Sequence, residues 1–146
     1  MKHRTLHEIE AEARVMPGPP SRALRRERLE RLATVLEERC APVRLLSRIE
    51  YLPRHECMRL RTDDSPLSFA YEDPVLRAQG LKSDRLGDAM AFFDLSLDEA
   101  HHLVCDCHYY GAVTSDVVAS RARFIAKRVS FAELWGKVRN VLSCWW

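Results

Sequence analysis

Residues 95–111 read LSLDEAHHLVCDCHYYG, and this stretch carries the clearest helix signals in the chain. Ser96 and Glu99 have the spacing of a capping box, in which each side chain accepts a hydrogen bond from a backbone N–H that the helix leaves unpaired. Gly111 suits the position just after a helix, because glycine adopts a left-handed backbone without strain. We therefore expect one continuous helix over residues 97–110.

Similar signals divide the flanking sequence into further short helices. Apolar residues recur every three or four positions over residues 22–40 and 43–52, which is typical of a helix with one buried face. Asp73-Pro74 predicts another helix start, since aspartate caps a helix and proline suits its first position. By contrast, we expect residues 62–71, with Asp63-Asp64-Ser65-Pro66, to form a surface loop. The other expected helices span residues 54–60, 74–79, 83–93 and 115–128, and a last one follows a second capping box, Ser130 with Glu133.

The pattern as a whole predicts an all-α protein. No stretch alternates between apolar and polar residues over the length of a strand, and no internal repeat is visible. Met16-Pro17-Gly18-Pro19-Pro20 breaks the chain before the first strong helix signal. We expect residues 1–20 to form a flexible N-terminal arm and residues 21–146 to form a single domain, a compact bundle of about six or seven short helices.

Composition is that of a soluble globular domain. The 146 residues are 47% hydrophobic and 30% charged, and no run approaches the ~18 apolar residues of a membrane span. The five cysteines are too few and too unevenly spaced for a secreted disulfide scaffold. Residues 1–14 place three glutamates before any apolar run and do not resemble an export signal. We expect a cytoplasmic protein with free thiols.

Charge is segregated along the chain, although the net charge is only +2. Counting lysine and arginine against aspartate and glutamate, residues 1–62 sum to +5, residues 63–116 to −8 and residues 117–146 to +5. These segments can neutralise one another across a folded surface. Alternatively, the basic segments form a face that binds nucleic acid or an acidic partner.

Histidine and cysteine side chains gather on the helix that follows the first capping box. His101, Cys105 and His108 lie at positions i, i+4 and i+7, so an α-helix places them along one edge of its buried stripe. Two imidazoles and a thiolate can bind zinc together with a fourth ligand, and His55 and Cys57 form the only other close pair of such residues. These five residues make up a candidate zinc or iron site.

Two other interpretations of these residues stay open. Cys105-Asp106-Cys107 is C-x-C rather than the C-x-x-C of common zinc motifs, so the histidines can be purely structural. On a continuous helix, Cys107 falls on the core stripe and is expected to be a small buried hydrophobic residue. A neighbouring imidazole can also favour the thiolate of Cys105, which would make this a thiol-redox protein.

Nucleic-acid binding is a third possibility. The helices expected over residues 83–93, 97–110 and 115–128 have short turns between them, as in tri-helical DNA-binding units. On the last of these helices, Arg123 and Lys127 face away from the core stripe, where they can contact phosphates. The acidic exposed side of the middle helix argues against this interpretation.

The most C-terminal part of the sequence is rich in tryptophan. Trp135, Trp145 and Trp146 either cover the core of their own chain or bind a partner or a second copy, since aromatic side chains are common interface anchors. No glycine-rich phosphate loop, H-E-x-x-H or G-x-S-x-G motif occurs. We therefore predict a non-enzymatic interaction or regulatory module that binds a protein partner and needs no cofactor, with the metal protein as the alternative.

Overall fold

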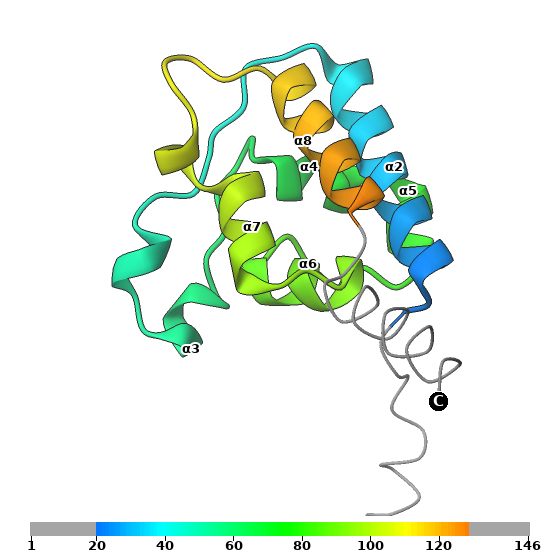
Figure 1. The fold of residues 1–146 in the computed structure, drawn as a ribbon, viewed down its shortest axis with the longest axis horizontal. Helices are drawn as coiled ribbons and strands as arrows, with labels where there is room; N and C mark the ends of the chain where they lie inside the picture. Colours follow the sequence, from blue (N-terminus) through cyan, green and yellow to red (C-terminus); the bar gives the residue numbers. More distant parts are fainter. Residues whose placement is uncertain (1–19, 129–146) are drawn as a thin grey trace, which may run out of the picture.

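The computed structural model describes residues 20–128, and this part of the chain folds into seven α-helices (Figure 1). They are α2 (Arg22–Arg39), α3 (Arg54–Cys57), α4 (Pro66–Glu72), α5 (Pro74–Ala78), α6 (Leu86–Phe93), α7 (Leu97–Val104) and α8 (Ser115–Lys127). Two 3-10 helices, η1 (Ile49–Tyr51) and η2 (Asp106–His108), lie in the connections. No β-strand forms between residues 20 and 128, and the predicted all-α fold class is confirmed.

Some predictions concern residues that lie outside this range. They are the arm over residues 1–19, the capping box of Ser130 with Glu133, and the side chains of Trp135, Trp145 and Trp146. Among the helices of residues 20–128, none is long and apolar enough to cross a membrane.

The two longest helices, α2 and α8, lie side by side (Figure 1). Leu32 of α2 and Ala122 of α8 are fully buried, and the small alanine lets the two helix backbones approach closely. At the edge of the interface, Arg123 of α8 forms ion pairs with Glu30 and Glu37 of α2. Burying one leucine stabilises the fold by about 1.5–3 kcal/mol, whereas a partly exposed ion pair contributes about 1 kcal/mol or less. Apolar contact therefore dominates this interface.

Helices α6 and α7 complete the core around Phe93. This side chain is fully buried, and its ring meets the ring of Phe92 edge-on with 4.9 Å between the centroids. The capping box predicted at the start of α7 is confirmed. The Ser96 hydroxyl accepts a hydrogen bond from the Glu99 N–H, and the Glu99 carboxylate accepts one from the Ser96 N–H, both at 3.1 Å. The capping box thus fixes where α7 begins, and His101 lies in the last turn of this helix.

The helix predicted over residues 43–52 is wrong, because residues 41–47 form no helix and contain two isolated bridge residues, Pro42 and Leu46. We call residues 41–47 the strap. Val43 and Leu46 of the strap are buried, whereas Leu45 is only half-buried. The strap is held by backbone pairing with segments that are distant in sequence, so periodicity alone could not reveal it. Two isolated bridges join Pro42 to Thr114 and Leu46 to Cys105.

Two helix boundaries also differ from those predicted. Residues 66–72 form α4 rather than a loop, since the Ser65 hydroxyl accepts a hydrogen bond from the Ser68 N–H and Pro66 occupies the first turn. The helix expected from residue 83 begins at Leu86, because Ser83 instead caps the preceding turn by accepting from the Arg85 N–H. The start predicted at Asp73-Pro74 is confirmed as that of α5.

The carboxylate of Asp73 joins α5 to α2. It accepts a hydrogen bond from the Leu76 N–H at 3.1 Å and forms a two-pronged ion pair with Arg31, at 2.6 and 3.2 Å. The hydrogen bond from Arg31 holds the pKa of this nearly buried carboxyl below its usual range. Because the pKa is lower in the folded than in the unfolded chain, this interaction stabilises the protein at neutral pH. The stabilisation is lost as the pH falls from about 4 through the folded-state pKa.

The variant Asp73→Asn keeps the capping oxygen and removes the charge. We expect it to lower the free energy of unfolding by about 1–2 kcal/mol at pH 7. The difference from the parent should shrink as the pH falls below about 4, where Asp73 of the unfolded parent begins to be protonated while the folded parent still holds it ionised. Urea unfolding of both proteins at pH 7 and pH 3 measures this. A difference that is the same at both pH values would show that the charge of Asp73 is not its cause.

Candidate metal centre

The chain leaves the path of helix α7 just before Cys105, so the prediction of one helix over residues 97–110 is wrong. The cause is the strap. The Leu46 N–H donates to the Val104 carbonyl at 2.8 Å, and the Leu46 carbonyl accepts from the Asp106 N–H at 2.9 Å. Pairing with Leu46 turns Cys105 to an extended conformation, with φ −88° and ψ 135°. A single 3-10 turn, η2, follows this break.

The break in the helix brings the sulfur atoms of Cys105 and Cys107 together. On an α-helix, residues two positions apart differ by about 200° around the axis and cannot face one point. Around the break, the two sulfur atoms lie 3.2 Å apart. Cys105 is fully buried, but Cys107 is exposed, so the prediction that Cys107 is a buried core residue is wrong.

Two further ligand-type side chains converge on these sulfurs. His101 lies in the last turn of α7 with its Nε2 atom 3.4 Å from Cys107 Sγ. Glu50 in η1 has its Oε2 atom 3.2 Å from His101 Nε2 and 3.9 Å from Cys105 Sγ. The four ligand atoms all lie within 4.8 Å of one another. We call Glu50, His101, Cys105 and Cys107 the metal cluster.

The separations within the metal cluster are close to the edge lengths of a tetrahedral metal site. Bonds of about 2.3 Å to sulfur and about 2.0–2.2 Å to nitrogen or oxygen place neighbouring ligand atoms about 3.3–3.8 Å apart. The four separations given above are 3.2, 3.4, 3.2 and 3.9 Å. The cluster can therefore hold one metal ion after small shifts, chiefly a slightly wider spacing of the two sulfurs.

Burial and hydrogen bonding set the proton affinities inside the cluster. Burial raises the pKa of the Cys105 thiol to about 12. The pKa of Glu50 lies below its usual range, because its carboxylate accepts hydrogen bonds from its own backbone N–H and from His101. A thiol that holds its proton so firmly is a poor nucleophile at neutral pH, whereas a metal cation displaces the thiol proton directly. The site is therefore better suited to metal binding than to thiol chemistry.

His108, predicted as a metal ligand, lies behind His101. Its Nε2 atom is 2.9 Å from His101 Nδ1, the ring nitrogen that does not face the cluster. Burial, together with the charges of His102, His101 and Arg121, lowers the pKa of His108. A neutral His108 can thus accept the proton of His101 Nδ1–H. Outer hydrogen bonds of this kind fix the ring orientation of a metal-bound histidine.

Arg121 of α8 holds the residues around the break in place. Its guanidinium donates hydrogen bonds to the carbonyls of His102 and His108, on either side of the break. It also stacks over the ring of Tyr109 at 3.7 Å from the centroid. The Tyr109 hydroxyl donates to the Leu103 carbonyl at 2.6 Å, and burial raises its pKa to about 12. The positions of both cysteines thus depend on a contact with the neighbouring helix.

The other two predicted ligands do not belong to the cluster. Cys57 is buried, and its thiol donates to the Ile49 carbonyl at 3.0 Å. His55 is exposed beside Glu56. Both belong to α3, whose contact with η1 is the hydrogen bond from Cys57 to Ile49.

The sequence argument misses two members of the cluster, Glu50 and Cys107. The C-x-C pair was a usable signal for Cys107, but the expectation of a continuous helix placed its two sulfurs on different sides. Nothing local in the sequence points to Glu50. Its position depends on the strap, which places η1 beside the end of α7.

The residues predicted to contact nucleic acid have different surroundings. The guanidinium of Arg123 is engaged by Glu30 and Glu37 of α2 and thus serves helix packing. Lys127 is exposed at the end of α8.

No protein-family model, curated protein or solved structure matches this chain.

Proposed function

We propose that this protein is a zinc-binding helical module in which the metal cluster holds one ion. The observation that carries the proposal is the convergence of four ligand atoms to within 4.8 Å of one another. They come from three places in the fold, namely η1, the last turn of α7, and the break with η2. Two thiolates, one imidazole and one carboxylate form a complete ligand set for zinc.

The donor set favours zinc over the common hard cations. Magnesium and calcium prefer sites built only from oxygen ligands, whereas thiolates select zinc, copper(I) and iron. Four protein ligands at tetrahedral separations are typical of a structural zinc site. Iron(II) accepts the same donors and is the alternative metal.

The proposed role of the ion is architectural rather than catalytic. Four protein ligands leave no open position for a substrate. The ion would fasten η1 to the end of α7 and so stabilise the segment that carries Glu50. The proposal thus takes up the metal-binding alternative from the sequence, in a non-enzymatic form. We also propose a cytoplasmic location, because free cysteines such as Cys105 and Cys107 persist in a reducing compartment.

Titration with cobalt(II) followed by zinc tests this proposal. Cobalt in a tetrahedral site with two thiolates absorbs strongly in the visible range and reports both geometry and sulfur ligation. We expect the absorption to saturate at one cobalt per chain and to disappear when one equivalent of zinc is added. Absence of thiolate bands at saturating cobalt, in folded and fully reduced protein, would refute the proposal.

His108 supplies a test of how the metal site is organised. The variant His108→Phe removes the acceptor for His101 Nδ1–H and leaves all four proposed ligands in place. We expect zinc affinity to fall by about 10- to 100-fold, which is the usual effect of losing an outer hydrogen bond to a metal ligand. Competition with a chromophoric chelator measures this affinity. A complete loss of cobalt–thiolate absorption in the variant would instead identify His108 as a direct ligand.

A further inference from the structure

Exposed arginines that lack a side-chain partner are concentrated near α3. Most other arginines of residues 20–128 contact a carboxylate, a carbonyl or an aromatic ring, as Arg31 does with Asp73. Outside residues 44–59, Arg26 and Arg85 are isolated exposed arginines without such a contact. By contrast, four arginines within residues 44–59 are exposed and make no side-chain hydrogen bond, ion pair or ring contact within residues 20–128. They are Arg44, Arg48, Arg54 and Arg59.

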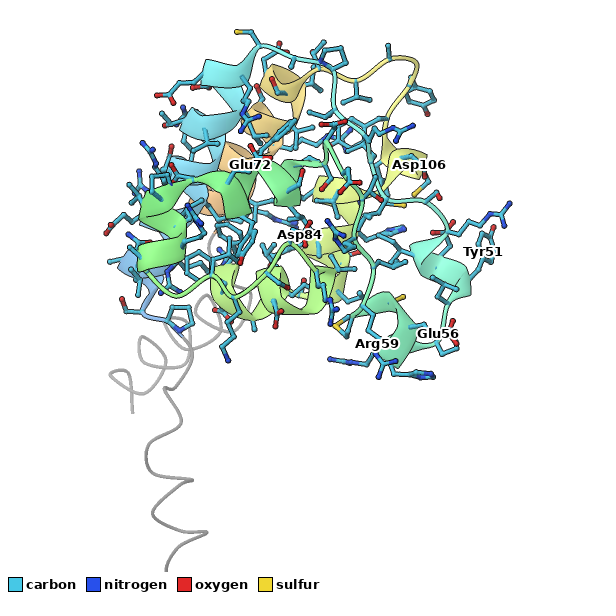
Figure 2. The ribbon with its side chains drawn as sticks, turned by 180° about the vertical axis from the view of Figure 1, so that it is seen from behind. Tyr51, Glu56, Arg59, Glu72, Asp84 and Asp106 are labelled. Carbon is cyan, nitrogen blue, oxygen red and sulfur yellow. The ribbon has the colours of Figure 1, made fainter. Side chains whose placement is uncertain are left out.

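Within the segment itself, acidic side chains offset only part of this positive charge. Residues 44–59 contain only two, Glu50 and Glu56, and Glu50 belongs to the metal cluster. Figure 2 shows Tyr51, Glu56 and Arg59 at one edge of the molecule. We call residues 44–59 the basic corner.

Among residues 20–128, the two most exposed aromatic side chains are close in sequence to members of the metal cluster. Tyr51 is 79% exposed and follows Glu50 directly in the chain, and Tyr110 is 99% exposed and lies three residues after Cys107. A tyrosine ring that is mostly exposed to solvent contributes little to the stability of its own fold. Exposed rings beside unpaired arginines are instead the elements with which proteins hold unpaired bases and phosphates.

The basic corner is attached to the fold at a few defined points. Gly87 of α6 donates its N–H to the Met58 carbonyl at 3.0 Å, and a Cβ atom at Gly87 would lie only 2.9 Å from the Cβ of Met58. Leu86 likewise donates to the Leu60 carbonyl at 2.9 Å. A zinc ion on Glu50 would add a further attachment near the middle of the corner. The arginines are thus presented on a braced segment rather than on a loose loop.

We propose that the basic corner binds single-stranded nucleic acid, with its arginines on phosphates and Tyr51 stacked on a base. Arginine matches phosphate through two parallel hydrogen bonds and is the preferred residue for this contact. Helix α3 has only four residues, which is too short to read the major groove of a duplex. An acidic peptide would engage the arginines but would have no need of the exposed tyrosine. The inference rests on the proposed function in one respect, since zinc would hold the corner rigid.

Fluorescence anisotropy with a labelled 12-nucleotide single-stranded DNA of mixed sequence tests the inference. We expect the parent to bind in low salt and affinity to fall as salt rises. The triple variant Arg48→Gln, Arg54→Gln and Arg59→Gln should bind at least tenfold more weakly. The slope of log affinity against log salt concentration should also become shallower by about 2, because each of the three lost phosphate contacts contributes about 0.7 to the slope on single strands. Tyr51→Ala should weaken binding about five- to tenfold, the loss of about 1 kcal/mol of stacking.

Matched variants on other surfaces serve as controls. The charge control combines Arg26→Gln in α2, Lys82→Gln in the loop before α6 and Lys127→Gln in α8, which removes three positive charges, as the triple arginine variant does. The ring control is Tyr71→Ala, which removes a less exposed tyrosine. Both should bind like the parent. An equal loss in the charge control, or displacement of the strand by polyglutamate as efficiently as by unlabelled DNA, would overturn the inference.

Zinc content measured on the same samples separates the two proposals. Zinc-loaded protein that does not bind the strand in low salt overturns the inference and leaves the zinc proposal standing. Protein that holds no zinc but loses strand binding in the triple arginine variant refutes the zinc proposal and supports the basic corner.

Discussion

Replacing Cys105 by serine is expected to abolish tight zinc binding and the stabilisation that zinc provides. Cys105 is the fully buried sulfur ligand and lies at the point where the strap breaks α7. Structural zinc sites contribute about 10–16 kcal/mol in apparent binding free energy, so one of four ligands accounts for about 2.5–4 kcal/mol. We expect zinc affinity to fall by roughly two to three orders of magnitude. Chelator competition measures the affinity, and thermal unfolding with and without zinc measures the stabilisation.

Cys57→Ser is the matched control for this substitution. Cys57 is also buried, but its thiol donates to the Ile49 carbonyl and it lies outside the metal cluster. We expect the control to keep the parent's zinc affinity. Equal loss of affinity in both variants would mean that general destabilisation, rather than loss of a ligand, explains the result for Cys105.

Arg121→Met is expected to weaken both the fold and the metal site. The substitution keeps most of the side-chain volume but removes the hydrogen bonds to the His102 and His108 carbonyls and the stacking on Tyr109. Charge-assisted hydrogen bonds and cation–π contact together predict a loss of about 1.5–3 kcal/mol in the free energy of unfolding. Because the same contacts position η2, zinc affinity should also fall about tenfold.

Arg123→Met separates these two effects. Arg123 lies two residues further along α8, and its ion pairs with Glu30 and Glu37 join α8 to α2 rather than to η2. We expect this variant to lower stability by about 1 kcal/mol and to leave zinc affinity unchanged. If zinc affinity fell equally in both variants, the proposed link between Arg121 and the metal cluster would be wrong. Urea unfolding and chelator competition on both variants provide the comparison.

The predictable parts of the fold are those whose signals are local. The capping box of Ser96 with Glu99 and the start at Asp73-Pro74 each depend on residues within one turn, and both are confirmed. The start at Ser65-Pro66 carries a similar local signal, but the two preceding aspartates favoured a loop. Burial was predictable in part. Val43 and Leu46 are buried as expected although their segment is not helical, whereas Cys107 is exposed because the helix expected to bury it ends before Cys105.

The metal cluster was only half predictable, because its geometry depends on a contact that is distant in sequence. Helical spacing correctly singled out His101 and Cys105 as neighbours. Pairing of Leu46 with Cys105 then breaks the helix, turns Cys107 towards the cluster and leaves His108 behind His101. None of these three changes can be predicted from residues 97–110 alone.

Elemental analysis of the purified protein tests the central claim most directly. The protein is prepared without an affinity tag or chelator, under reducing conditions, and metal content is measured per chain. Four ligand atoms within 4.8 Å of one another predict one zinc per chain, retained in Cys57→Ser and absent in Cys105→Ser. Folded parent protein that contains no stoichiometric metal, and takes up none when zinc is added, would contradict the account.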